Sequence, residues 1–338
     1  MSKHNFIPQF VPYWDNKEKK AVQKILDQDY LNEHKTVREF ETEFAKFVNA
    51  KYCVTVTSGT TALYLAIQAI NHNHRIKKIN IPNYASIFLA NACLQSNIIP
   101  ILNDVSSSGS MISNIKNRFI VHSNGRIGNT EMLEDCAQSI SHHTKNSLSC
   151  YSFASTKHLT TAGQGGAICC DDDETFDTLT RLKDLGRNDR QKLKPMSDHF
   201  EYWGINSKFT EIQAAFGLVQ LKKLPKRLKK LEKMYKVFKN ELKNNKEIEF
   251  FDDEPKWYID LKIKNPQLFI ERLLKHNIQC RRFYKPLHLQ PLFLKQNSKS
   301  FSKSISLYES GVWLPSTTNL SDNDLEYIID SIKLVLKN

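Results

Sequence analysis

The sequence lacks a long apolar run. No segment approaches the roughly 20 consecutive apolar residues that a helix needs to span a bilayer. The amino-terminal segment MSKHNFIPQFVPYW contains no such run either. We therefore expect a cytoplasmic protein with no membrane partner.

The sequence also lacks paired cysteines. Its 7 cysteines are an odd number, and no two of them form a CxxC pair. This spacing argues against a disulfide framework and against a zinc ribbon. We expect reduced thiols and no metal site.

Acidic residues are scarce relative to basic ones. The chain has 36 Asp and Glu against 48 Lys and Arg, a net charge of +12, and such an excess could indicate a nucleic-acid partner. Much of it, however, lies in residues 222–246, where apolar side chains recur at spacings of three and four. That pattern predicts an amphipathic helix with a solvated, lysine-rich face. We therefore expect no nucleic-acid partner, although a basic surface favours anionic substrates by steering.

The arrangement of apolar segments indicates an α/β fold. With 338 residues, of which 40% are hydrophobic, the chain can bury one large core and one smaller core. Strand-like runs alternate with helical patterns, which favours a parallel sheet. These runs are residues 51–57, 79–82, 98–104, 119–121 and 167–170. We place a large domain at residues 1–225 and a small α+β domain at residues 226–338, with Pro225 at the boundary.

The stretch from Glu134 to Asp173 has the features of a cofactor site. Asp135, Gln138, Ser152 and Lys157 lie close to two apolar runs that look like buried strands. A lysine reacts with an aromatic aldehyde only as the free amine, so it should be desolvated or lie beside another positive charge. An aspartate that faces a pyridine nitrogen keeps it protonated, which lets the ring withdraw electrons from a carbanion. We therefore expect Lys157 to be the catalytic lysine and Asp135 to bind the ring.

The turn SGTT, which begins at Ser58, is a candidate phosphate site. A strand-like segment precedes it and a helical pattern follows it. The free N–H groups and the positive dipole end of such a helix bind phosphate readily. Gly59 permits close approach and Thr60 adds a hydroxyl. An ordinary capped helix would need no ligand, and it is the downstream lysine that favours phosphate binding.

Together these residues resemble the DegT/DnrJ/EryC1/StrS family of nucleotide-sugar aminotransferases, which use pyridoxal 5'-phosphate. The family signature is an acidic pair, Ala-Gln, Ser-Phe, three residues, a lysine and a Gly-x-Gly-Gly turn. Its positions here are Glu134-Asp135, Ala137-Gln138, Ser152-Phe153, Lys157 and Gly163–Gly166. The segments SGTTAL, GINSKFTEIQAA and YKPLHLQP match in the family's order, and this order along nearly the whole chain is far more specific than any one motif. The resemblance implies fold type I, the aspartate-aminotransferase fold, with a large, mostly parallel sheet and a small α+β carboxyl-terminal domain.

The resemblance also implies roles for individual residues. Lys157 would hold the cofactor, Asp135 would face the ring nitrogen and Gln138 would lie near the 3-oxygen. Ser152 joins Gly59 and Thr60 among the residues expected to bind the cofactor.

Other implied contacts involve a second subunit and the substrate. Asn206 and Lys208 would reach the cofactor phosphate of the partner in a homodimer with shared active sites. Tyr30 and His288 correspond to family positions near the substrate. The expected substrates are L-glutamate and a nucleotide-linked keto sugar, for which we expect a 4-keto-6-deoxyhexose on dTDP, UDP or GDP.

Two departures from the family pattern are evident. Ser86 stands where the family carries an aromatic residue that stacks on the cofactor ring; Tyr84 could supply the ring instead, or the stack could be missing. Glu134 follows Val105 by only 29 positions, where the family has a longer segment. We expect at least one helix to be missing there.

Three alternative functions stay open at this point. A 3-aminotransferase of the same family would use the same signature. A family dehydratase carries histidine in place of the lysine, and His158 follows Lys157 directly but is one residue out of register. A regulatory or nucleic-acid-binding protein could keep the fold without catalysis.

Overall fold

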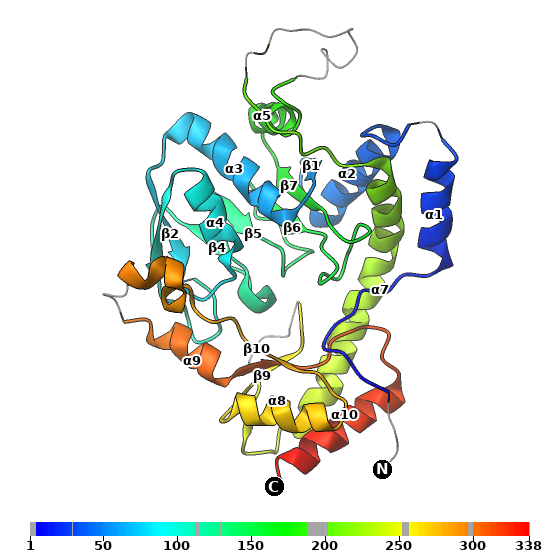
Figure 1. Ribbon diagram of the computed structural model, residues 1–338, viewed down its shortest axis with the longest axis vertical. Helices are drawn as coiled ribbons and strands as arrows, with labels where there is room; N and C mark the ends of the chain where they lie inside the picture. The colour runs from blue at the N-terminus through cyan, green and yellow to red at the C-terminus, as the bar shows by residue number, and fades with distance from the viewer. Residues whose placement is uncertain are drawn as a thin grey trace.

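The computed structural model describes residues 5–28, 30–111, 115–128, 130, 132–187, 200, 202–251, 257–296 and 300–337. A larger unit surrounds a central sheet, and a smaller unit surrounds a second sheet (Figure 1). One long helix, α7 (Glu211–Leu242), extends from the larger unit into the smaller one. The expected α/β class is confirmed.

The central sheet has five strands in the order β1–β7–β6–β5–β4. They are β1 (Tyr52–Val56), β4 (Phe119–Val121), β5 (Leu133–Asp135), β6 (Leu148–Ser152) and β7 (Gly166–Cys170). β4, β5 and β6 are parallel, whereas β7 is antiparallel to both of its neighbours. A parallel pair, β2 (Lys78–Pro82) and β3 (Ile99–Asn103), adjoins β4 through a bridge between Asn80 and Arg118. The expected parallel sheet is thus only partly correct, because the chain returns from β6 to β7 without the crossover helix that a parallel pair usually needs.

Helices cover both faces of this sheet. They are α1 (Asn16–Leu26), α2 (Lys35–Val48), α3 (Gly59–His74), α4 (Ile87–Gln95) and α5 (Asp173–Lys183), together with the first half of α7. Val54 and Ile168 point into the core under α3 and α4, while Cys53 and Cys169 point into the core under α2 and α7. Because successive side chains of a strand point to opposite faces, strands buried on both sides appear in the sequence as continuous apolar runs.

Helix α7 is continuous through Pro225. It begins with a capping box, in which Thr210 is the N-cap and Gln213 pairs with it. Proline lacks a backbone N–H and disfavours a helix interior. Burial offsets that cost here, because Leu224 belongs to the large core and Leu231 to the small one. The helix therefore runs across the expected domain boundary at Pro225, and the division of domains at residue 225 stays a prediction.

The smaller unit is an antiparallel sheet with helices, as predicted. The strand order is β10–β11–β9–β8. Its elements are β8 (Ile248–Glu249), β9 (Asp260–Ile263), α8 (Pro266–Lys275), β10 (Arg281–Arg282), α9 (Ser302–Ser310), β11 (Gly311–Trp313) and α10 (Asp322–Val335). The amino-terminal segment joins this unit, because Ile7 N donates to Asn277 O at 2.8 Å and Gln279 N donates to Ile7 O at 2.9 Å.

The segment between Val105 and Glu134 is short, as predicted. Its described residues contain β4, the first residue of β5 and a single turn of 3-10 helix, η1 (Ser123–Gly125), but no α-helix. In the described ranges of the chain as a whole, no helix combines the length and the apolar character that a membrane crossing requires.

Candidate active site

Several of the predicted cofactor residues lie at one end of the central sheet. Asp135 is the last residue of β5 and Ser152 the last residue of β6, and these two strands are parallel neighbours. Gly166 begins β7 directly opposite Ser152. In α/β folds, ligands bind outside the carboxyl ends of parallel strands. Asp135 and Ser152 therefore occupy the edge at which a ligand is expected.

The start of α3 lies against the end of β6 so closely that only glycine fits. A Cβ built on Gly59 would lie 2.7 Å from the Cβ of Ser152, and one on Gly166 would lie 2.4 Å from the carbonyl oxygen of Ser58. Ser58 caps the helix with its side chain. The close approach gathers Gly59, Thr60 and Ser152 around the positive dipole end of α3, an arrangement that suits a phosphate.

Asp135 is a buried acid without a full counter-charge. Its side chain is about 4% exposed, and Oδ1 accepts a hydrogen bond from Ala137 N at 3.0 Å. Burial raises the pKa of Asp135, while the bond from Ala137 and the charges of Lys157 and His122 act in the opposite direction. The net shift is upward, so a further positive group would stabilise the carboxylate. A protonated pyridine nitrogen is such a group.

Lys157 follows β6 in a turn and is partly buried. Burial lowers its pKa from the ordinary 10.5 to about 8; the carboxyl of Asp135 opposes this shift and the guanidinium of Arg281 adds to it. The free amine therefore becomes the main form above about pH 8 rather than above pH 10.5. The lysine thus has the desolvated surroundings that the sequence argument required.

Two consecutive residues of the small unit hold the turn that carries Lys157. The hydroxyl of Tyr258 donates to Thr156 O at 2.5 Å, and Nε2 of His158 donates to the carbonyl oxygen of Trp257. Nζ of Lys157 lies 4.8 Å from the centroid of the Trp257 ring. Burial lowers the pKa of His158 to about 4, so this imidazole is neutral near pH 7. Sequence reasoning did not single out Trp257 or Tyr258, because no local motif connects them to the lysine.

Gln138 is oriented by a loop that was not predicted. Its Oε1 accepts a hydrogen bond from Asn124 N at 2.6 Å, which leaves the amide NH₂ group as the donor for a ligand oxygen. Asn124 has a left-handed backbone, with φ 57°, and its side chain accepts from Nε1 of Trp313 at 3.2 Å. Tyr84 also bonds to Asn124 and is fully buried by protein side chains. Tyr84 therefore contributes to the site through its hydrogen bond with Asn124. The partly exposed Ser86 is the N-cap residue of α4.

Asn206 and Lys208 lie away from this cluster in sequence and are held by Asp184. The backbones of Asn206 and Asp184 form an antiparallel bridge. Nζ of Lys208 donates to Oδ1 of Asp184 at 2.6 Å, so the amine has a partner within its own chain. Asn206 is exposed just before α7. Their contact with a cofactor phosphate stays a prediction.

The two predicted substrate residues have contrasting surroundings. Tyr30 is about 55% exposed and lies edge-on to His34. His288 is about 2% exposed, bonds through Nδ1 to Asn83 and lies with its ring centroid 4.6 Å from that of Phe301. Tyr30 is free to meet a ligand, whereas His288 is buried and held by Asn83. Both substrate contacts stay predictions.

Glu134, the neighbour of Asp135, points into the opposite core. Potential ligand atoms of His122, Glu134 and Cys136 lie within 4.8 Å of one another. However, the Glu134 carboxylate already accepts hydrogen bonds from Thr144 N at 2.6 Å and from Ser147 Oγ at 3.1 Å. Burial opposes ionisation of Glu134, but hydrogen bonds from His122, His142 and Ser149 and the charge of His122 hold its pKa well below the usual range. The arrangement satisfies the buried carboxylate without a metal ion.

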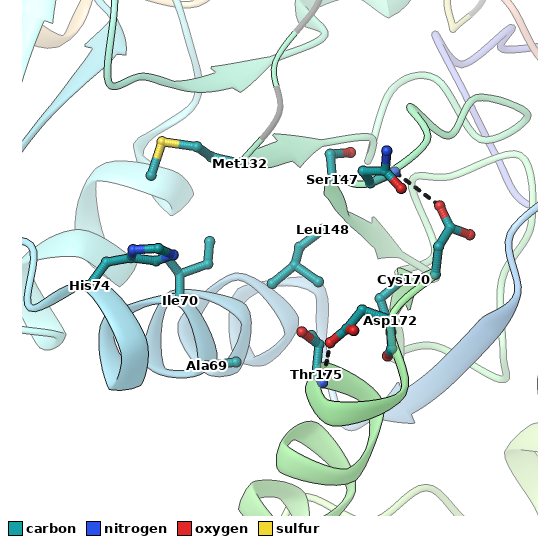
Figure 2. A pocket seen from close by; sticks show the side chains of 11 residues that line it. Ala69, Ile70, His74, Met132, Ser147, Leu148, Cys170, Asp172 and Thr175 are labelled. Atoms are coloured by element: carbon teal, nitrogen blue, oxygen red, sulfur yellow. Dashed lines mark hydrogen bonds between the residues drawn. The ribbon is translucent and has the colours of Figure 1, made fainter.

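A separate pocket lies at the other end of the same strands (Figure 2). Its volume is about 370 Å³. Leu148, which begins β6, and Cys170, which ends β7, both line it, so it is far from Ser152 and Gly166 along those strands. Asp172 in its wall caps Thr175 N at 2.7 Å. Nothing in this pocket connects it with Lys157.

Known proteins are similar to this chain in sequence and in fold. A GDP-perosamine synthase of Vibrio cholerae is 25% identical over an alignment 371 residues long, gaps included. The alignment covers 97% of this chain and 98% of that protein. The spore coat polysaccharide biosynthesis protein SpsC of Bacillus subtilis is 24% identical, with 99% and 98% covered. Among solved structures, the Helicobacter pylori aminotransferase PseC, involved in the biosynthesis of pseudoaminic acid, superposes with a TM-score of 0.88 at 21% identity and covers 98% of this chain and 100% of its own. This likeness confirms the expected fold type.

The family itself follows from a match along most of the sequence. The model of the DegT/DnrJ/EryC1/StrS aminotransferase family matches residues 12–121 and 128–333. The matched residues include every position of the signature, from Gly59 through Lys157 to His288. The chain belongs to the DegT/DnrJ/EryC1/StrS aminotransferase family.

Proposed function

We propose that this enzyme is a pyridoxal 5'-phosphate-dependent aminotransferase that transfers the amino group of L-glutamate to a nucleotide-linked keto sugar. The observation that carries the proposal is the meeting of Lys157, with its lowered pKa, and the buried acid Asp135 at one sheet edge. Solved structures of a putative sugar aminotransferase, Spr1654 of Streptococcus pneumoniae, in PLP and PMP forms share the fold, with TM-scores of 0.85 and 0.86. The residues of this site fit that cofactor.

The chain's own side chains divide the work of binding and proton transfer. Asp135 would pair with the ring nitrogen and Gln138 would donate to the 3-oxygen. Gly59, Thr60 and Ser152 would hold the phosphate. When bound, the cofactor supplies an electron-withdrawing ring. The amine of Lys157 would take the proton from the donor carbon as a general base and deliver it to the cofactor as a general acid within the first half-reaction. In the second half-reaction it would move a proton in the reverse direction, onto the sugar carbon that receives the amino group.

The most specific form of the proposal is a 4-keto-6-deoxyhexose substrate that becomes the 4-amino-4,6-dideoxy sugar. Similar proteins support it, since they include GDP-perosamine synthases and a dTDP-4-amino-4,6-dideoxy-D-glucose transaminase of Shigella dysenteriae, which is 24% identical to this chain. A GDP-4-keto-6-deoxy-D-mannose 3-dehydratase of Yersinia pseudotuberculosis is also similar, at 26% identity. Amination is favoured over dehydration because Lys157 occupies the lysine position, and because the His158 imidazole is committed to Trp257.

A panel of nucleotide sugars tests the substrate. We expect 4-keto-6-deoxyhexoses on at least one of dTDP, UDP and GDP to gain an amino group in the presence of L-glutamate, because the anionic carrier suits the basic protein. Mass spectrometry distinguishes the amino sugar from a dehydrated product and from unreacted ketone. Turnover of 3-keto sugars alone would contradict the C4 assignment, and a dehydrated product would favour the dehydratase.

We also propose a homodimer in which Asn206 completes the partner's site. Support comes from its exposed position before α7 and from the family resemblance. A two-fold axis would make both sites equal. Lys157→Ala and Asn206→Ala homodimers should each be impaired. In a mixed dimer both lesions fall in one site and the other site is intact, so random exchange should restore about a quarter of wild-type activity, since half of the dimers are mixed.

The control for this experiment is the exchange itself, followed with differently tagged subunits and native mass spectrometry. Demonstrated exchange without any recovery of activity, or an active monomer, would show that Asn206 does not act across subunits.

A further inference from the structure

Three residues form a row across the small sheet on the side of Trp313. Trp313 of β11 is the register partner of Arg281 on β10 and of Asp260 on β9. Residues directly opposite in neighbouring antiparallel strands point to the same face. Arg281 and Asp260 therefore flank Trp313, whose ring lies in the apolar cluster that also contains Tyr84 and Trp257.

The two charged ends of this row differ in how they are neutralised. Asp260 is buried and receives both Nη atoms of Arg126 from the larger unit, at 2.6 and 3.1 Å. Arg281, at the other end, is exposed, and its guanidinium carbon lies 5.9 Å from the Trp313 ring centroid. No carboxylate in the described ranges forms an ion pair with Arg281. Asp260, at one end of the row, is therefore neutralised by Arg126, whereas Arg281, at the other end, has no such counter-charge among the described residues.

Trp257 supplies a second unsatisfied donor between Arg281 and the catalytic lysine. Its side chain is about 3% exposed, and its indole N–H has no acceptor among the described residues. The ring lies 4.8 Å from Nζ of Lys157 and 5.2 Å, edge to face, from the ring of Trp313. A buried N–H without a partner is costly, so an acceptor atom of a bound molecule could accept a hydrogen bond from this indole N–H.

We propose that the Arg281 guanidinium and the Trp257 indole N–H form a subsite for a carboxylate of the amino donor. The proposal rests on the proposed function and adds the residues that recognise the donor. A guanidinium binds a carboxylate through two parallel hydrogen bonds. The electrostatic effect of Arg281 on Lys157, which lowers the lysine pKa, indicates that the two cations are near each other.

The alternative anion, the diphosphate of the sugar carrier, suits this position less well. In an amino acid the α-carboxylate is attached to the carbon that bears the reacting amine, so it must lie beside Lys157. In a nucleotide sugar, the ring separates the keto carbon from the diphosphate. Arg281 and Lys157 lie against two rings of the same aromatic cluster. Arg281 is therefore better placed to bind the carboxylate of the amino donor than the diphosphate of the sugar carrier.

The two half-reactions separate these possibilities. We expect Arg281→Gln to raise the L-glutamate concentration needed for half-maximal rate in the first half-reaction by about 10- to 100-fold, the range for losing a hydrogen-bonded charge pair. The reaction of the amine form with the keto sugar should change less than about twofold. Arg281→Lys should give an intermediate effect because it keeps the charge but loses the fork. Trp257→Phe, which keeps a ring but removes the N–H, should raise the same glutamate concentration by about 3- to 10-fold.

Direct binding supplies a readout that does not depend on turnover. Glutarate keeps two carboxylates but has no amine to react. Calorimetric titration of glutarate into the enzyme, with and without cofactor, should show a matching loss of affinity in Arg281→Gln. Lys285→Gln is the matched control, since it removes an exposed positive charge four residues along the chain and should bind glutarate as the wild type does.

Each outcome decides one proposal. Wild-type glutamate and glutarate binding in Arg281→Gln would overturn the subsite, and so would a loss confined to the sugar half-reaction, which would assign Arg281 to the diphosphate. Glutarate binding that depends on Arg281 in an enzyme that aminates no sugar would keep the subsite and overturn the proposed function.

Discussion

Replacing Lys157 by alanine is expected to lower the transamination rate by about 10⁴-fold or more. The proton transfers assigned to its amine are worth about 10²- to 10⁴-fold alone, and the covalent attachment of the cofactor is lost as well. The visible absorbance that the lysine-bound cofactor gives should disappear. Steady-state kinetics and an absorbance spectrum of the purified variant are the measurements.

The control for this variant is Lys229→Ala, on the exposed face of α7. It should keep both the spectrum and the rate of the wild type. Circular dichroism should show that the Lys157→Ala variant is folded, because the hydrogen bond of Lys157 within the turn runs from its backbone N–H to Ala154 O and is kept in the variant. A Lys157→Ala enzyme that retained the cofactor spectrum would show that another amine attaches the cofactor.

Replacing Arg126 by methionine should lower the free energy of unfolding by about 3–5 kcal/mol, the usual cost of removing one partner from a buried ion pair. The side chains of Arg126 and Asp260 are about 3% and 1% exposed, and their closest atoms are 2.6 Å apart. The variant leaves the Asp260 carboxylate buried without its counter-charge. Urea unfolding followed by circular dichroism measures the change.

Two further variants make this prediction specific. The double variant Arg126→Met with Asp260→Leu removes both charges, so it should be more stable than Arg126→Met alone. Lys46→Met, which breaks the pair with Glu43 on an exposed helix face, should change the free energy by no more than about 1 kcal/mol. A double variant whose loss equals the sum of the two single losses would show that the pair contributes no mutual stabilisation.

Features with a local physical cause were predicted from the sequence. The helix expected after the SGTT turn and the amphipathic helix expected within residues 222–246 are present as α3 and α7, because caps and apolar periodicity depend on residues three or four positions apart. The strands around Ile79 and Ile168 are confirmed for a similar reason, since short apolar β-branched runs indicate buried strands. The approach of Gly59 to Ser152 agrees with the predicted phosphate turn.

Features that depend on distant partners were missed. Proline disfavours a helix interior, but α7 continues through Pro225 because Leu224 and Leu231 pack into two cores. The direction of β7 depends on which strand receives it, and no nearby residue encodes that choice. In the site, Lys157 was found because its signature is contiguous, but Tyr258 contacts a residue 102 positions earlier. Arg281 is placed by the register of the small sheet and Trp257 by the contact of its carbonyl oxygen with His158, 99 positions earlier, and a single sequence reveals neither.

The pairing of the amino-terminal segment with the small unit affects the order in which the chain can fold. The amide of Gln9 donates to the side chain of Gln279, 270 residues later. At about 5–20 residues per second, this segment leaves the ribosome roughly a quarter of a minute to a minute before its partners. The larger unit can therefore assemble around a leading end that is still unattached, and contacts so distant in sequence form slowly. A fragment that begins after α1 would lack this edge of the small unit, and supplying residues 5–11 as a separate peptide should restore it.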